Sequence, residues 1–269
     1  MEESTTPPQP AEATSIRFNP YALNAARVYD YLGDGIDVFP GGREVGAWLG
    51  IAPGLRAAMR ANRDFLIRVV DDLGRRGHDQ FVDFEGGLPV RRKLHQTARA
   101  VNPEARVAYV NNDRRVVVRG RELLESPAVA VVSGDVRRPD AAFNHPVLTR
   151  LIDARRPVVV IAGAVLHFVT DEQAAGFVRR LRARLAPGSK IVLSHACSDD
   201  AMACPGAATP LALRSEKEIA ALLEGCELEE PGLVEASRWP EPGPAEDGAT
   251  AMFVGGVADL NAYGFPGKC

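Results

Sequence analysis

The sequence predicts an α/β fold in which helices cover both faces of a mostly parallel sheet of about seven strands. Short runs of consecutive apolar residues, such as VVVIAGAV at 158–165, are typical of strands that are buried on both faces. Stretches with apolar residues at helical spacing separate these runs, and this alternation indicates βαβ units with right-handed crossovers. A glycine-rich turn, EGGLP at 85–89, follows the first run, and doubly wound folds bind ligands beyond such strand ends.

The residues before the first strand are expected to lie outside the sheet. Residues 1–15 are polar and proline-rich, and we interpret them as a disordered tail. Residues 16–78 are interpreted as an N-terminal helical lid segment, and residues 79–269 as a Rossmann-like domain. In the lid segment, apolar residues recur at helical spacing over Tyr21–Tyr31, Val45–Leu49 and Leu55–Leu73.

Strands and helices then alternate through the domain. We expect strands at Gln80–Phe84, Arg106–Val110, Ala128–Ser133, Pro157–Ala162, Ser189–Ser194, Leu233–Ser237 and Thr250–Val254. We expect helices at Val90–Val101, Arg114–Leu124, His145–Leu151, Glu172–Leu185 and Ser215–Leu223. The connection EPGPAEDG at 241–248 is rich in turn residues, so the last two strands are predicted to form an antiparallel hairpin.

Composition limits the classes of protein and partner. The chain has 269 residues, 46% of them hydrophobic, and a net charge of −3, which gives no electrostatic reason to expect a nucleic acid partner. The sequence contains no signal peptide pattern and no apolar run near ~20 residues, so we expect a cytoplasmic protein without a membrane span. The four cysteines lack metal-ligand spacing, and no metal is expected. The oligomeric state cannot be read from the sequence.

Polar and small residues follow each of the first five predicted strands. These segments are Asp83–Gly87, Asn111–Asp113, Gly134–Asp135, Ala164–Phe168 and Ser194–Ala196. Because the carboxyl ends of parallel strands share one edge of the sheet, we expect these segments to form the binding site.

These segments, in this order, resemble the class I S-adenosylmethionine-dependent methyltransferases. The sequence is most similar to a bacterial family, common in actinomycetes, that was long catalogued as a domain of unknown function. The similar phrases extend from residue 26 onward and are ARVYDYL, MRANRDFL, GLPV, NND, GDVRRP, VLHFV, LAPGS and LSHA. The resemblance implies an S-adenosylmethionine-dependent methyltransferase that acts on a small molecule, with residues 79–269 as the methyltransferase domain.

The resemblance also implies a set of site residues. The cofactor would be bound by Arg27, Tyr29, Asp83, Glu85, Gly86, Gly87, Asn111, Asn112, Asp135, Val136 and Ala164. Asp135 would accept a hydrogen bond from the adenine amino group. His167 and His195 are the candidate catalytic bases, because an imidazole titrates near neutral pH.

Three segments depart from the usual pattern of the family. The first loop usually reads Asp-Ile-Gly-Thr-Gly-Leu-Pro-Thr, and here Glu85 stands at the first glycine. A carboxylate about 4 Å from that of the methionine half would cost on the order of 4 kcal/mol at an effective dielectric constant near 20. The family has Asp-Asn-Asp after the second strand, and Asn111 replaces the first aspartate, with one uncharged carbonyl as acceptor. Residues 33–38 replace a Gly-Gly-Lys-Asp-Asn loop.

These changes leave two functional hypotheses open. One is a methyltransferase with an altered cofactor site. The other is an eroded relative that keeps the fold without methyl transfer, either as a repurposed enzyme or as a non-catalytic binding or regulatory protein.

Several site residues also have a structural alternative. Asp83 is a candidate helix cap and Glu85 a solvated loop acid. His167 and His195 are candidate packed, hydrogen-bonded histidines. Tyr29 is a candidate for helix packing, and Arg27 for a surface ion pair.

Overall fold

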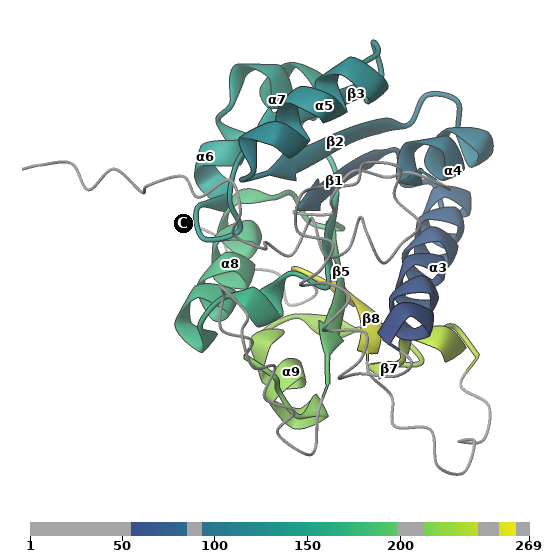
Figure 1. The fold of residues 1–269 in the computed structure, drawn as a ribbon, viewed down its shortest axis with the longest axis vertical. Coiled ribbons are helices and arrows are strands. Elements are labelled where there is room, and N and C mark those ends of the chain that lie inside the picture. The colour runs from purple at the N-terminus through teal and green to yellow at the C-terminus, as the bar shows by residue number, and fades with distance from the viewer. Residues whose placement is uncertain (1–54, 85–92, 198–211, 242–252, 262–269) are drawn as a thin grey trace, which may run out of the picture.

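The computed structural model describes residues 55–84, 93–197, 212–241 and 253–261, and in this part of the chain the predicted α/β fold is confirmed (Figure 1). The strands are β1 (Gln80–Phe84), β2 (Arg106–Asn111), β3 (Val129–Ser133), β4 (Val159–Gly163), β5 (Lys190–Ala196), β6 (Glu227–Leu228), β7 (Val234–Glu235) and β8 (Phe253–Asp259). The helices are α3 (Leu55–Arg75), α4 (Leu94–Val101), α5 (Arg114–Leu124), α6 (Pro139–Phe143), α7 (Pro146–Leu151), α8 (Asp171–Arg184) and α9 (Glu216–Leu222). Two 3-10 turns, η1 (Leu166–Phe168) and η2 (Ala236–Arg238), complete the described elements.

The strands form one sheet in the order β3-β2-β1-β4-β5-β8-β6, and β7 pairs with β8 outside this path. Strands β1 to β5 are parallel to their neighbours, whereas β8 runs antiparallel to β5, β6 and β7. The strand order reverses between β1 and β4, because the chain moves outward to β3 and then returns to the other side of β1. Doubly wound folds bind their ligands at the carboxyl ends of the strands near this reversal.

Each of the seven predicted strands has a counterpart in the sheet, and the predicted hairpin is confirmed by the pairing of β7 with β8. The expectation of about seven strands missed β6, which has only two residues and therefore carries no periodic signal. The short helix α6 was also missed.

The last strand, β8, continues past Val254, where the predicted strand ended. The prediction stopped there because Gly255 and Gly256 are typical of a loop. A Cβ at Gly255 would lie 2.7 Å from the ring of Phe65, and one at Gly256 would lie 2.8 Å from the Gly232 carbonyl oxygen. Close approach of other chain segments therefore explains glycines that, in sequence, resemble a loop.

Side-chain hydrogen bonds define where several helices begin. Asp113 caps α5, and its side chain accepts a hydrogen bond from the backbone N–H of Arg115. Helix α8 begins with a capping box between Thr170 and Gln173, which satisfies N–H groups that have no partner within the helix.

The sheet separates two hydrophobic cores, with α6 and α8 on one side and α3 and α4 on the other (Figure 1). Alternate residues of β1 contribute to opposite cores: Phe84 packs on the α8 side against Phe143 and Phe177, and Phe81 belongs to the α3 side. By the same alternation Asp83 lies on the α3 side of the sheet.

Helix α3 is the described part of the segment at 16–78, and it packs directly on the sheet. Leu66 lies against Gly163 at the carboxyl end of β4. Ten residues later, Arg76 pairs with Glu229, which also pairs with Lys190 at the start of β5. The helix therefore runs antiparallel to these strands, and the turns before Leu66 extend past the carboxyl edge of the sheet, where a ligand would lie.

Candidate functional site

Six of the eleven predicted cofactor residues, and both candidate bases, lie in the described part of the chain. They are Asp83, Asn111, Asn112, Asp135, Val136, Ala164, His167 and His195. Arg27, Tyr29, Glu85, Gly86 and Gly87 lie outside the described residues, as do residues 33–38, so the expectations for them stay predictions. The described residues lie at the carboxyl ends of β1, β2, β3, β4 and β5 or directly after them.

Asp83 is a buried carboxyl group at the end of β1. Its side chain is 1% exposed, and neither oxygen has a hydrogen-bond partner among the described residues. Burial raises its pKa to about 7, although the positive charge of Arg63 acts in the opposite direction. Asp83 does not cap the next helix, because the N-cap of α4 is Lys93. The position of Asp83 is therefore better suited to a ligand with a positive charge or hydrogen-bond donors.

Asn111 ends β2 and is 3% exposed. Its Oδ1 accepts a hydrogen bond of 2.8 Å from the backbone N–H of Asp113. A backbone N–H requires an acceptor, so this contact assigns which end of the amide is oxygen. The Nδ2 group has no partner among the described residues. Oδ1 keeps a second lone pair, so the expectation that Asn111 presents its carbonyl to a ribose stays a prediction, and Nδ2 adds a donor without a partner among the described residues.

Asp135 follows β3 and is held by Arg137. Its Oδ1 accepts 2.8 Å hydrogen bonds from the backbone N–H and from Nε of Arg137, and its Oδ2 accepts from Nη2. Burial would raise the pKa of Asp135, but the hydrogen bonds from Arg137 and Asn112 outweigh it and lower the pKa. The structure thus brings Asn112 and Asp135 together, and Val136 beside them is buried.

Asn62 is a buried polar residue outside the predicted set of cofactor residues. It is 2% exposed, and its Oδ1 has no hydrogen-bond partner among the described residues. Asn62 lies one turn before Leu66 and so belongs to the part of α3 that extends past the carboxyl edge. The sequence did contain a signal, because an asparagine interrupts the apolar face formed by Met59 and Leu66.

Ala164 has a backbone conformation that is unusual for a residue with a side chain. Its φ angle is 52°. Among the described residues other than glycine, only Ala164 has a positive φ angle. Its N–H donates to both the carbonyl oxygen and Oγ of Ser194, at 2.9 and 3.0 Å. Left-handed conformations of this kind cost of order 1–3 kcal/mol and concentrate at functional sites. The contacts with β5 therefore fix the chain direction directly after β4.

His167 and His195 lie close together, with ring centroids 5.2 Å apart in an edge-to-face arrangement. Both are buried. Burial lowers the pKa of His195 to about 4 and lowers that of His167 well below its usual value, and the nearby Arg214 charge acts in the same direction. Both imidazoles are therefore neutral at physiological pH.

Arg214 joins these histidines to the loop after β4, and no sequence pattern predicted this role. Its side chain is buried and paired with Asp171 at 2.7 Å. The guanidinium also donates to the carbonyl oxygens of Leu166 and Val169, and Nη1 lies 2.8 Å from Nε2 of His195.

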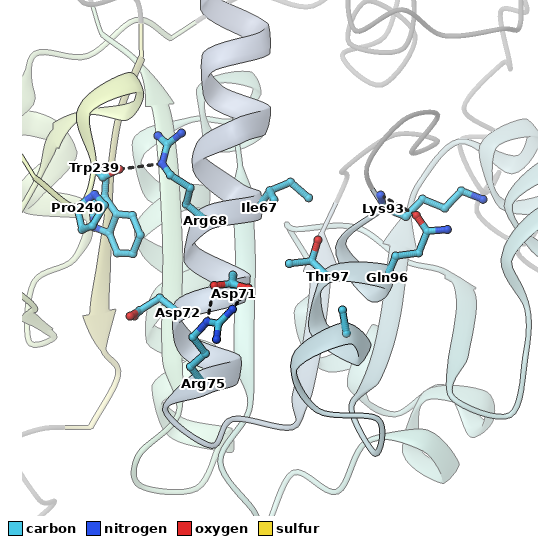
Figure 2. A pocket seen from close by; sticks show the side chains of 11 residues that line it. Ile67, Arg68, Asp71, Asp72, Arg75, Lys93, Gln96, Thr97, Trp239 and Pro240 are labelled. Carbon is cyan, nitrogen blue, oxygen red and sulfur yellow. Dashed lines mark hydrogen bonds and ion pairs between the residues drawn. The ribbon is translucent and has the colours of Figure 1, made fainter.

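A groove of about 630 Å³ lies elsewhere, between α3, α4 and Trp239–Pro240 (Figure 2). Arg68 in this groove donates to the Trp239 carbonyl oxygen at 2.8 Å, and Asp71 pairs with Arg75 at 2.7 Å. None of the predicted site residues lines it, and it lies along the C-terminal half of α3, away from the carboxyl edge. We therefore do not include the groove in the candidate site.

Within the described residues, neither a metal-binding cluster nor a membrane-spanning helix is found. Within these ranges, no cluster of three or more histidine, cysteine, aspartate or glutamate side chains is suited to hold a metal ion. No helix in the described part of the chain is long and apolar enough to cross a membrane.

A mostly parallel sheet with this strand order, with buried polar groups at its carboxyl edge, defines the class I S-adenosylmethionine-dependent methyltransferase fold. The chain belongs to the S-adenosyl methyltransferase family, whose model matches residues 12–261. The resemblance found in the sequence is thus confirmed.

Two solved structures share both sequence and fold with the chain. A DUF574 family protein from Streptomyces avermitilis is 36% identical, with a TM-score of 0.80, and the match covers 89% of this chain and 98% of that one. A candidate methyltransferase from Thermobifida fusca is 32% identical, with a TM-score of 0.81, over 89% of this chain and 95% of that one. Among curated proteins, none matches the chain.

Proposed function

We propose that the protein binds S-adenosylmethionine at the carboxyl ends of β1, β2 and β4 and transfers the methyl group to a small molecule. One observation carries the proposal: buried polar atoms of Asp83, Asn111 and Asn62 have no hydrogen-bond partner among the described residues. An unsatisfied buried polar group costs about 1–3 kcal/mol. A polar ligand that pairs with these atoms would remove this cost.

The chemistry of these groups fits S-adenosylmethionine. The Asp83 carboxylate would accept from the ammonium group of the methionine half, and the positive charge would favour its ionised form. Nδ2 of Asn111 would donate to a ribose oxygen. Asp135, already held by Arg137, retains lone pairs for the adenine amino group. The cofactor would supply an electrophilic methyl group on a sulfonium.

The main contribution of the protein to methyl transfer would be to position the reactants. The rigid turn at Ala164 and the bonds of Arg214 fix the loop after β4, where the family resemblance places groups near the transferred methyl. Holding nucleophile and methyl group in line removes much of the entropic cost of a bimolecular reaction. We also propose that residues 16–78 cover this site as a lid and that the protein is cytoplasmic.

The second candidate function, an eroded relative without methyl transfer, is favoured by Asn111. The usual carboxylate accepts from both ribose hydroxyls, whereas Asn111 offers an uncharged Oδ1 that already accepts from Asp113, together with a neutral Nδ2 donor. The difference between a charge-assisted and a neutral hydrogen bond is about 1–2 kcal/mol. This loss weakens cofactor binding without excluding it.

Isothermal titration with S-adenosylmethionine and S-adenosylhomocysteine separates the two candidates. Methyltransferase function predicts a dissociation constant in the micromolar range, and Asp83→Asn should weaken binding of S-adenosylmethionine at least tenfold, about 1.4 kcal/mol. Asp71→Asn is the matched control, because Asp71 lies on the exposed face of α3 beside Arg75. Absence of binding heat at millimolar ligand would end the first proposal.

A further inference from the structure

The protons of His167 and His195 can be placed from their hydrogen-bond partners. A guanidinium only donates, so Nε2 of His195 must accept from Nη1 of Arg214 at 2.8 Å. The proton of neutral His195 is therefore on Nδ1, which lies 2.7 Å from the carbonyl oxygen of Ala196, an acceptor. Both ring nitrogens of His195 are thus engaged within the protein.

The same reasoning applies to His167. The backbone N–H of Ala196 donates to Nδ1 of His167 at 3.3 Å. This nitrogen must present its lone pair to the N–H, so the single proton of neutral His167 is on Nε2. The contact is fixed by the fold, because Ala196 is the last residue of β5 and His167 lies in η1, directly after β4.

Burial is the largest cause of the lowered pKa of both imidazoles, and the buried guanidinium of Arg214 is a charge that acts on both in the same direction. It lies at a 3% exposed position and disfavours a second positive charge on either imidazole. Asp171, whose side chain is 87% exposed, pairs with the guanidinium and favours protonation of His195. Uncharged Phe168 and Phe253 pack against His167 at centroid distances of 4.4 and 6.2 Å.

We infer that His167 serves the methyl-transfer site as a neutral hydrogen-bond donor through Nε2–H, and that Arg214 is the positioning residue that maintains this state through His195. The interpretation of His167 as a general base is thereby replaced. A base needs a free lone pair, and the one lone pair of this tautomer already accepts from Ala196.

This inference rests on the proposed function for its chemical consequence. A donor at this position suits a methyl acceptor that presents a lone pair to His167, such as a phenolate, a carboxylate, a carbonyl oxygen or an aromatic ring nitrogen. The nucleophile would either arrive deprotonated or lose its proton elsewhere. The substrate class is therefore one with a hydrogen-bond acceptor beside, or at, the atom that is methylated.

Nitrogen-15 NMR of the ligand-free protein tests the inference without any substrate. The chain has five histidines, and the variants His167→Gln and His195→Gln assign the two relevant ring signals. We expect His167 to show a protonated Nε2 and an unprotonated Nδ1 from about pH 5 to about pH 8, without titration. Titration of His167 within this range, or a proton on Nδ1, would overturn the inference whether or not the protein binds S-adenosylmethionine.

Two variants of Arg214 distinguish positioning by charge from a merely structural role. Arg214→Lys keeps the positive charge with fewer donors, and His167 should remain neutral. Arg214→Gln keeps a donor and removes the charge, so the titration midpoint of His167 should rise above that in Arg214→Lys, although burial still holds the pKa of His167 below its usual value. The midpoints are followed down to the lowest pH at which the fold is retained, and equal midpoints of His167 in the two variants would show that the charge of Arg214 does not hold its state. A thermal unfolding curve for each variant verifies that the fold is retained.

Discussion

Replacement of Asp83 by asparagine should stabilise the ligand-free protein, and more so at high pH. The folded protein raises the pKa of Asp83 from 3.8 to about 7, mainly through burial. The folded state therefore binds this proton more tightly than the unfolded state does. Its stabilising effect is present below about pH 3.8 and is lost as pH rises toward about 7. Asparagine is neutral throughout and does not incur this loss.

The size of the effect follows from the two pKa values. At about 1.4 kcal/mol per pH unit, the difference between 3.8 and about 7 corresponds to about 4 kcal/mol in total. About 3 kcal/mol of this falls between pH 5 and 7. The stability advantage of Asp83→Asn over the wild type should therefore grow by about 2–3 kcal/mol between pH 5 and 8, with weaker S-adenosylmethionine binding as the functional cost.

Urea denaturation of both proteins at about pH 5 and about pH 8 measures this difference. Other groups that titrate in the interval are common to both proteins and cancel in the comparison. Asp71→Asn is again the control, because Asp71 pairs with Arg75 on the outer face of α3. An advantage of Asp83→Asn that is equal at both pH values would refute the buried, partnerless state of the carboxyl.

Three further predictions concern single side chains. Asn111→Asp should tighten S-adenosylhomocysteine binding by roughly 5–30-fold in calorimetry, because a charged acceptor replaces the free amide; its control is Asn102→Asp at the end of α4, outside the candidate site, and unchanged or weaker binding of Asn111→Asp would contradict the reasoning. Glu229→Gln should lower the free energy of unfolding at about pH 7 by about 1–3 kcal/mol. Burial opposes ionisation of Glu229, but hydrogen bonds from its two cationic partners lower its pKa to about 2. The stability that the Glu229 carboxylate contributes is therefore present above about pH 4.5 and lost as pH falls through about 2. An equal loss of stability in Glu229→Gln at pH 2 would be inconsistent with this pH dependence. Gly255→Ala should lower the free energy of unfolding by about 1–3 kcal/mol, since its Cβ would lie 2.7 Å from a buried ring. Gly176→Ala within α8, where the nearest neighbouring atom to the new Cβ is 3.8 Å away, should raise the free energy of unfolding by about 0.5–1 kcal/mol. Thermal denaturation measures both changes.

The elements that the sequence predicted best are those with local signals. Buried strands such as β4 are continuous apolar runs, and α5 and α8 show helical periodicity with capping residues at their starts. Prediction failed where the signal was short or came from distant contacts. Two residues of β6 have no measurable period. Gly255 of β8 is explained by Phe65, which lies about 190 residues away in the chain.

For the candidate site, sequence reasoning found the strand ends but not the direction of the side chains. Asn111 was correctly placed at the end of β2, but its sequence position did not reveal that Oδ1 accepts from Asp113 while Nδ2 has no partner among the described residues. Asn62 was passed over because a single polar residue in a helix does not reveal whether it is buried. These properties depend on packing, which one sequence without its fold does not contain.

The order of strands and helices, the parallel sheet and the position of the ligand-binding edge were determined by the sequence itself, because these follow from the periodicity of neighbouring residues. The tertiary structure alone decided that Arg214 meets His195, 19 positions earlier, and Asp171, 43 positions earlier. It likewise decided that the Ala196 amide sets the proton of His167. Hydrogen bonds between distant segments form only when the fold brings donor and acceptor within about 3 Å in a suitable direction.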